Sequence, residues 1–347
     1  MIRENFREQL ITSAKKRGLG KAVDLLLAEA QECAYITIAK RRRPSDDEPG
    51  ASRIGGMPDL PRNAQWPCGL DKNGKPFGYA RFLAQFNLAD IPALEGLPLP
   101  KRGHLWLFFQ SLEDYNTIHV AAIHDPNSKG LHTRKPPTKT DWGHNVAAYG
   151  APPGISLPIS GSLAIRFERG ISLPYRESLM RLLWATIDPR AAAEEGWSGF
   201  PEDVMRVLTD LENPDARDGQ VGGRSAQLDG DLYRVITFRQ LGRPEMIYAD
   251  SWASIAEYEK SLRNLSLSGG FLEDVYDSSR KKRSQVEWID RHRAQIAVEA
   301  STWQLLFSFR SSLMDFGAPM YFDVFIRWAD LVAMRFDRLQ AACRSIT

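Results

Sequence analysis

The chain has 347 residues, of which 45 are basic and 43 acidic, and 43% of its residues are hydrophobic. This composition is typical of a globular protein with a large core and excludes an intrinsically disordered chain. The net charge of only +2 argues against a dedicated nucleic-acid-binding domain, which is usually clearly basic. At a typical size of about 100–200 residues per domain, the length corresponds to two domains or one large one.

The first residues, MIRENFREQL, lack the apolar core of a signal peptide, and no segment approaches the ~18 apolar residues of a membrane span. Cys33, Cys68 and Cys343 lie far apart, which fits a reduced cytosolic chain better than a disulfide framework or a zinc site. We therefore expect a cytoplasmic protein.

Residues 4–31 are predicted to form an amphipathic helix, because apolar side chains recur every three or four positions from Phe6 to Ala30. We expect residues 1–34 to be a helical extension and residues 35–347 to be one large domain on which the helix packs. The excess of Lys and Arg near this helix leaves contact with a membrane surface as an alternative.

Strand-like patterns then dominate the chain. Helices are also expected, together with long loops at 111–160 and an acidic insertion at about 188–230. The predicted strands are 35–41, 79–87, 104–110, 163–167, 232–238, 303–309 and 321–326. The predicted helices are 177–186, 201–212, 252–262 and 286–298.

Alternation within the strand 104–110 places His104, Trp106 and Phe108 on one face and the intervening apolar residues on the other. Residues 52–66, with two adjacent glycines and two closely spaced prolines, cannot form a helix or a central strand. We expect them to form an ordered segment rich in turns.

A strand, a turn, a glycine and an aromatic strand follow one another twice, from Phe82 to Phe109 and from Trp303 to Ile326. This repetition predicts two related halves, each containing a sheet. We expect an α+β fold with a β-rich core of this kind and an N-terminal amphipathic helix.

Several blocks carry a family resemblance. In the first half they are SRIGGMPDLP at 52–61 followed by Trp66-Pro67, FLAQFNLADIP at 82–92 and LPKRGHLWLFF at 99–109, and near the end they are WQLLF at 303–307, MDFG at 314–317 and FIRWADL at 325–331 with Phe336. On these blocks, residues 35–345 resemble the YwqG-like family, a bacterial family whose domain has no known function. The chain has Met314-Asp315-Phe316-Gly317 where that family usually has Gly-Asp-Ala-Gly. The resemblance implies an α+β fold with a β-rich core and implies no reaction.

Motifs for phosphate binding, for the GxSxG nucleophile elbow, and for HExxH, CxxC or EF-hand metal sites do not occur in the sequence. We therefore expect no cofactor and no metal site.

The histidines are unevenly distributed, since five of the six lie between 104 and 144. His104, His119 and His124 are the candidate catalytic residues, as general bases or as metal ligands on the loops near the strand 104–110. The alternative interpretation, which the spacing favours, is that they are ordinary strand and loop histidines.

Five residues are candidates for binding: Arg53, Trp66, Gln85, Trp106 and Asp315. The tryptophans could line a pocket or fill the core. Gln85 could hold the segment around Gly55-Gly56 or face a ligand. Arg53 could pair with Asp59 or anchor an anion. Asp315 could be a turn residue, which its position beside Gly317 favours, or a catalytic acid.

We expect a non-catalytic binding or interaction protein with a protein partner or a small-molecule ligand. One specific version is an immunity or antidote protein that masks a toxin with the acidic stretch 188–218. The alternative is a hydrolase or metal-dependent enzyme that uses the region from His104 to His144. We do not expect a nucleic-acid partner, although the basic runs at 40–43 and 280–283 leave that contact open.

Overall fold

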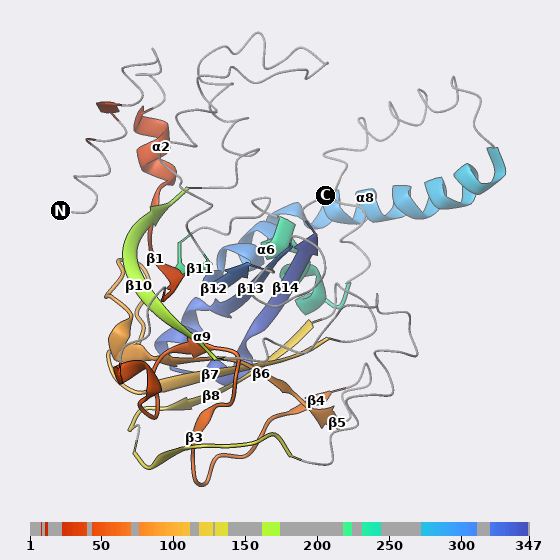
Figure 1. Ribbon diagram of the computed structural model, residues 1–347. Coiled ribbons are helices and arrows are strands. Elements are labelled where there is room, and N and C mark those ends of the chain that lie inside the picture. The colour runs from red at the N-terminus through yellow and green to blue at the C-terminus, as the bar shows by residue number, and fades with distance from the viewer. Residues whose placement is uncertain are drawn as a thin grey trace. The chain divides into compact units, whose positions relative to one another are not determined.

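The computed structural model describes residues 8, 11–12, 23–39, 44–70, 76–111, 118–127, 129–137, 162–173, 218–223, 231–243, 272–310 and 320–345. Figure 1 shows these residues as coloured ribbon. The chain divides into two compact units, the first of Met1–Asp229 with Gln304–Thr347 and the second of Gly230–Trp303.

The first unit is built on one ten-stranded sheet with the strand order β14-β13-β12-β11-β1-β10-β2-β6-β7-β8. Its strands in chain order are β1 (Gln31–Ile38), β2 (Arg53–Ile54), β6 (Arg81–Asn87), β7 (His104–Ser111), β8 (Ile118–Asp125), β10 (Leu163–Ser172), β11 (Gly219–Gly222), β12 (Trp303–Arg310), β13 (Met320–Arg327) and β14 (Gln340–Ser345). Two small two-stranded sheets join β3 (Asp59–Pro61) to β9 (Leu131–Thr133) and β4 (Cys68–Leu70) to β5 (Pro76–Tyr79).

The large sheet is strongly curved. Strand β10 pairs along its length with β1, and Figure 1 shows the pronounced bend of this strand. The two edge strands, β8 and β14, contact one another, and the short 3-10 helix η8 (Phe336–Arg338) contacts β8 beside them. The sheet is therefore nearly closed.

The expected α+β class is wrong, because the structure is β-rich and is organised around this nearly closed antiparallel sheet. The two expected sheet-containing halves form one continuous sheet. Both aromatic strand pairs, β6–β7 and β12–β13, turn an apolar face toward the same interior, so one curved sheet buries both.

The expected N-terminal amphipathic helix is likewise corrected. In the described part of this region, the helix α2 (Val23–Glu29) has seven residues and buries Val23 and Leu26. The chain enters β1 two residues after α2 ends, and β1 lies between β10 and β11 in the sheet. Helical spacing of the apolar residues extends over the two turns of α2. From Cys33 onward apolar and polar residues alternate instead, and the chain forms a strand of the sheet.

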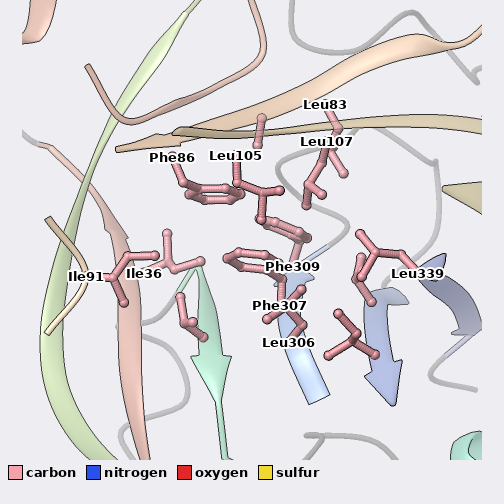
Figure 2. Close-up of a cluster of buried hydrophobic side chains, with 14 of the residues drawn as sticks. Ile36, Leu83, Phe86, Ile91, Leu105, Leu107, Leu306, Phe307, Phe309 and Leu339 are labelled. Carbon is pink, nitrogen blue, oxygen red and sulfur yellow. The ribbon is translucent and has the colours of Figure 1, made fainter. Parts of the chain in front are cut away.

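Figure 2 shows the main core, where side chains from opposite ends of the strand order meet. The ring of Phe86 on β6 stacks on the ring of Phe307 on β12, with centroids 4.3 Å apart and planes inclined by 7°. Leu105 and Leu107 of β7 belong to the same cluster, as does Leu339 just before β14. Burial of this apolar surface stabilises the closed form of the sheet.

A second core covers the opposite face of β6 and β7. It contains Leu60, Trp66, Phe82, Trp106 and Phe108. The separation of Trp106 and Phe108 from Leu105 and Leu107 is the alternation that the sequence predicts. A bulge at Leu83 shifts the register, so Phe82 and Gln85 both lie opposite residues of this second face.

In the described part of the second unit, residues 231–243 and 272–303, two helices pack together, α6 (Asp231–Gln240) and α8 (Leu272–Ser301). Phe238, Ile296 and Trp288 form its small core, and the guanidinium of Arg243 lies 5.0 Å from the Trp288 ring centroid. The predicted strand 232–238 is wrong, because these residues belong to α6. A short apolar run does not distinguish a strand from a buried helical segment.

Among the residues that the structure describes, no helix combines the length and the apolar character needed to cross a membrane.

We predict that Phe307→Ala lowers the free energy of unfolding of the first unit by about 3–5 kcal/mol, because it removes a fully buried ring and leaves a cavity. Urea denaturation of the full chain measures this change. Val298→Ala, at an exposed position of α8, is the control and is expected to change stability by less than about 0.5 kcal/mol. An equally small effect of Phe307→Ala would contradict the central place of this stack.

Candidate functional site

The residues from Gly50 to Pro61, which we call the anchored segment, follow a tightly constrained path across the second face of β6 and β7. Gly55 and Gly56 have φ angles of 70° and 71°, in the left-handed region that favours glycine. The Gly55 N–H donates a hydrogen bond to the Leu83 carbonyl over 2.8 Å. A Cβ at Gly56 would approach the Cβ of Ser162 to 2.9 Å, so there is no room for a side chain at this turn.

The carboxylate of Asp59 is the centre of the anchored segment. It is buried, and it forms an ion pair with the guanidinium of Arg53. Its Oδ2 accepts a hydrogen bond from the Gly50 N–H over 2.8 Å, and its Oδ1 accepts one from the Thr133 hydroxyl over 2.7 Å. One carboxylate therefore joins the start of the segment, β2 and the distant strand β9.

Gln85 holds the same segment from the sheet side. Its Oε1 accepts from the backbone N–H of Asp59 over 2.8 Å, and its Nε2 donates to the Ala51 carbonyl over 2.8 Å and to Asp59 Oδ2 over 3.2 Å. The side chain is fully buried, so these bonds satisfy polar groups that water cannot reach. This geometry matches the structural interpretation of Gln85, and its role in binding stays a prediction.

The imidazole of His104 binds the start of the anchored segment. Its Nε2 lies 2.8 Å from the Gly50 carbonyl oxygen, which can only accept, so this nitrogen carries the hydrogen. Burial lowers the pKa of His104 below its ordinary value of 6.5, although the bond to Gly50 and the charges of Asp90 and Asp125 oppose that shift. Gly50 has a φ of 89°, and a Cβ there would lie 2.5 Å from His104 Nε2, so glycine is required at this contact.

Both predicted tryptophans lie in the second core. The indole N–H of Trp66 donates to the Ala80 carbonyl over 2.8 Å, and its ring meets Phe108 edge-on with centroids 5.3 Å apart. Trp106 is fully buried and stacks on His104 with ring centroids 5.5 Å apart. Arg53, Trp66, Gln85, Trp106 and His104 are thus brought together around the anchored segment. Asp315 lies outside the described residues.

The three candidate catalytic histidines do not converge. His104 and His124 come from adjacent strands but lie on opposite faces of the sheet, and the His124 ring contacts Phe336 with centroids 4.8 Å apart. Burial also lowers the pKa of His124. His119 is exposed and lies six positions along β8 from the residue opposite His104, roughly 20 Å away at 3.4 Å per residue. Within the described ranges, no three His, Cys, Asp or Glu residues gather as metal ligands.

Sequence reasoning missed Gly50, Thr133 and the bonds of Ser52. The Ser52 hydroxyl donates to Asp90 over 2.7 Å and accepts from the Asn87 N–H over 2.9 Å, which ties the anchored segment to the end of β6. The Pro49-Gly50 turn was the available signal for Gly50. Thr133 carries no such signal, because it lies 74 residues from Asp59 in the chain.

A family model described as a domain of unknown function, DUF1963, matches residues 52–343. The chain belongs to the DUF1963 family. The match begins inside the anchored segment and reaches into β14, so it includes Arg53, Asp59, Gln85 and His104. No curated protein matches the chain. This match supports the expectation that the chain belongs to a family of unknown function. It does not confirm that the family is the YwqG-like one.

We predict that Asp59→Asn destabilises the DUF1963 domain by about 3 kcal/mol, because it leaves the largely buried Arg53 guanidinium without its countercharge while keeping the side-chain shape. Urea denaturation at neutral pH measures the change. Asp337→Asn, at an exposed position of η8, is the matched control and is expected to shift stability by less than about 0.5 kcal/mol. Equal effects of the two variants would show that the Asp59 network contributes little.

We predict that the domain loses stability as the pH falls through 6.5, the ordinary pKa of histidine. His104 has a lowered pKa in the folded state, so the unfolded chain binds more protons in this range and acid favours unfolding. Replacing this side chain, as in His104→Gln, is expected to flatten the dependence of the urea midpoint on pH between about 7.5 and 5.5. His132→Gln, at an exposed position of β9, is the control, and an unchanged slope in the His104 variant would contradict the assignment.

Proposed function

We propose that this DUF1963 protein is a non-catalytic binding protein that recognises its partner with the tip of the anchored segment. The observation that carries the proposal is the buried network around Asp59, which fixes a loop whose tip remains in solvent. Of residues 54–61, only Gly56 and Met57 are exposed, and Met57 exposes 42% of its surface.

A rigid loop is suited to recognition because little conformational entropy is lost when a partner binds it. The tip is held from both ends, by the Gly55–Leu83 backbone bond on one side and by Asp59 and Gln85 on the other. Met57 presents an adaptable apolar side chain at this fixed position, as is common on binding surfaces. These contacts support binding more directly than they support catalysis.

The enzyme alternative fits the geometry less well. His104, the most buried of the candidate histidines, donates its Nε2 hydrogen to Gly50, and that bond would have to break before this nitrogen could act as a base. His124 faces the other side of the sheet. A binding role requires no such rearrangement.

The proposal also covers the family label, the cellular compartment and the type of partner. We place the protein among YwqG-like proteins of the bacterial cytosol, where the exposed free thiol of Cys68 fits a reducing compartment. The partner is a protein or a small molecule, and the immunity version would use the acidic stretch 188–218. Of that stretch the structure describes only Asp218, whose carboxylate accepts from the Ile38 N–H over 2.6 Å.

The proposal predicts that the tagged full chain captures a stoichiometric partner from its native lysate and that Met57→Ser reduces the captured amount about tenfold. Mass spectrometry of the eluate for proteins, small molecules and metals measures this. Val298→Ser, also at an exposed apolar position but in the second unit, is the control and is expected to capture as wild type does. If Met57→Ser captures as much partner as the wild type does, the tip of the anchored segment is not the binding surface. An eluate without any partner would contradict the binding function.

A further inference from the structure

Three exposed apolar side chains lie close together in the chain after β13, and we call them the Trp328 patch. Trp328, Val332 and Met334 are 44%, 57% and 53% exposed. Trp328 and Val332 are four residues apart on α9 (Trp328–Val332) and so share one face of this helix, while Asp330 and Leu331 are buried. These are three of the five large hydrophobic residues that are exposed in the described part of the chain.

The fold itself does not require a large apolar side chain to be exposed here. After β6 the chain reads Leu88-Ala89-Asp90-Ile91, and after β13 it reads Trp328-Ala329-Asp330-Leu331. Each of these stretches forms a short helical turn directly after its strand. Leu88 is 1% exposed, whereas Trp328 at the same place in the second stretch is 44% exposed. The exposure of Trp328 is therefore a property of this particular turn.

The backbone at Met334 gives a second, independent indication. The Met334 N–H donates to the Leu331 carbonyl over 3.0 Å and the Arg335 N–H to the Asp330 carbonyl over 2.8 Å, the hydrogen-bond pattern that ends many helices with a glycine. Met334 occupies the glycine position with a φ of 55°, where a side chain is strained. Neither burial nor backbone preference accounts for a methionine here.

Two arginines, Arg335 and Arg338, follow the patch in the chain and contact Asp330 of α9. The buried Asp330 carboxylate accepts from Arg335 Nε over 2.7 Å, and Arg338 Nη1 lies 3.7 Å from the same oxygen. Both guanidinium-bearing side chains remain about half exposed. The two arginines balance Asp330 and Asp337 in charge, but Asp330 is buried, so residues 330–338 expose two guanidinium groups and one carboxylate.

We propose that the Trp328 patch is a docking surface for a segment of a partner protein that carries an apolar side chain flanked by carboxylates. Tryptophan, methionine and arginine are the residue types enriched at the centres of protein interfaces. The positioned guanidinium groups would pair with the partner's carboxylates, and the apolar face would cover its apolar side chain. This surface goes beyond the proposed function, because it does not involve the anchored segment.

The test is affinity selection of a displayed library of random short peptides on the folded full chain. We expect the enriched peptides to combine Asp or Glu with a large apolar residue. We expect their dissociation constants to rise about tenfold in Trp328→Ser and in Arg338→Glu. We also expect binding to weaken as the salt concentration rises, because the charged contacts lie at the surface.

Met334→Gly separates docking from folding. This variant removes the exposed side chain at a position where glycine is the favoured residue, so its thermal midpoint is expected to equal or exceed that of wild type while peptide binding weakens. Val298→Ser and Met57→Ser are the controls and are expected to keep full peptide binding. Because Met57→Ser tests the anchored segment alone, failure of one proposal leaves the other standing.

Four results would overturn the inference. The first is that no peptide is enriched, and the second is that the enriched peptides lack acidic residues or bind Trp328→Ser as well as wild type. The third is binding to vesicles of phosphatidylcholine with phosphatidylserine that Trp328→Ser abolishes while peptides bind weakly or not at all, which would assign the patch to a membrane surface. The fourth is a concentration-dependent dimer, seen by sedimentation, that Trp328→Ser abolishes, which would assign the patch to a second copy of the chain.

Discussion

The carboxylate of Asp59 is buried, and the path of the anchored segment depends on what it binds. It faces the Arg53 guanidinium, a backbone N–H at Gly50 and the hydroxyl of Thr133, so strands far apart in the chain share one acceptor. A buried carboxylate is costly unless it is paired and hydrogen-bonded, and here both conditions are met. Because Gln85 and His104 bind the same segment, a change at any one of these side chains affects the others.

This polar network lies against the second core, and the main core lies on the other side of β6 and β7. Strands β6 and β7 therefore contribute side chains to both cores, one from each face. One face supplies Phe86 and Leu105 to the closed interior of the sheet, and the other supplies Gln85 and Trp106 to the layer that carries the anchored segment. Packing on both sides makes β6 and β7 a rigid base, which is the condition for a loop to keep one conformation in solvent.

Local features of this fold could be read from the sequence because they depend on neighbouring residues. The two faces of β7 follow from alternation alone, and the glycines and prolines of residues 52–61 indicate an ordered turn. The closure of the sheet could not be read in this way, because it depends on contact between β8 and β14. The sequence predicts a strand at 232–238 where the structure has the helix α6, because seven residues of apolar pattern suit either structure. Thr133 was missed because only the folded chain brings it to Asp59.

The closure of the sheet also has a consequence for how the protein is made. Strands β6, β7 and β8 leave the ribosome early, whereas β14, which contacts β8, is among the last described residues to be synthesised. Until β12, β13 and β14 arrive, the apolar face of Phe86, Leu105 and Leu107 lacks the part of the main core that these three strands supply, and β8 remains an open edge. Nascent chains of this kind fold slowly because their stabilising contacts are distant in sequence. An incomplete sheet of this kind exposes apolar surface and an unpaired edge strand, the two features that make unfinished chains prone to aggregate during synthesis.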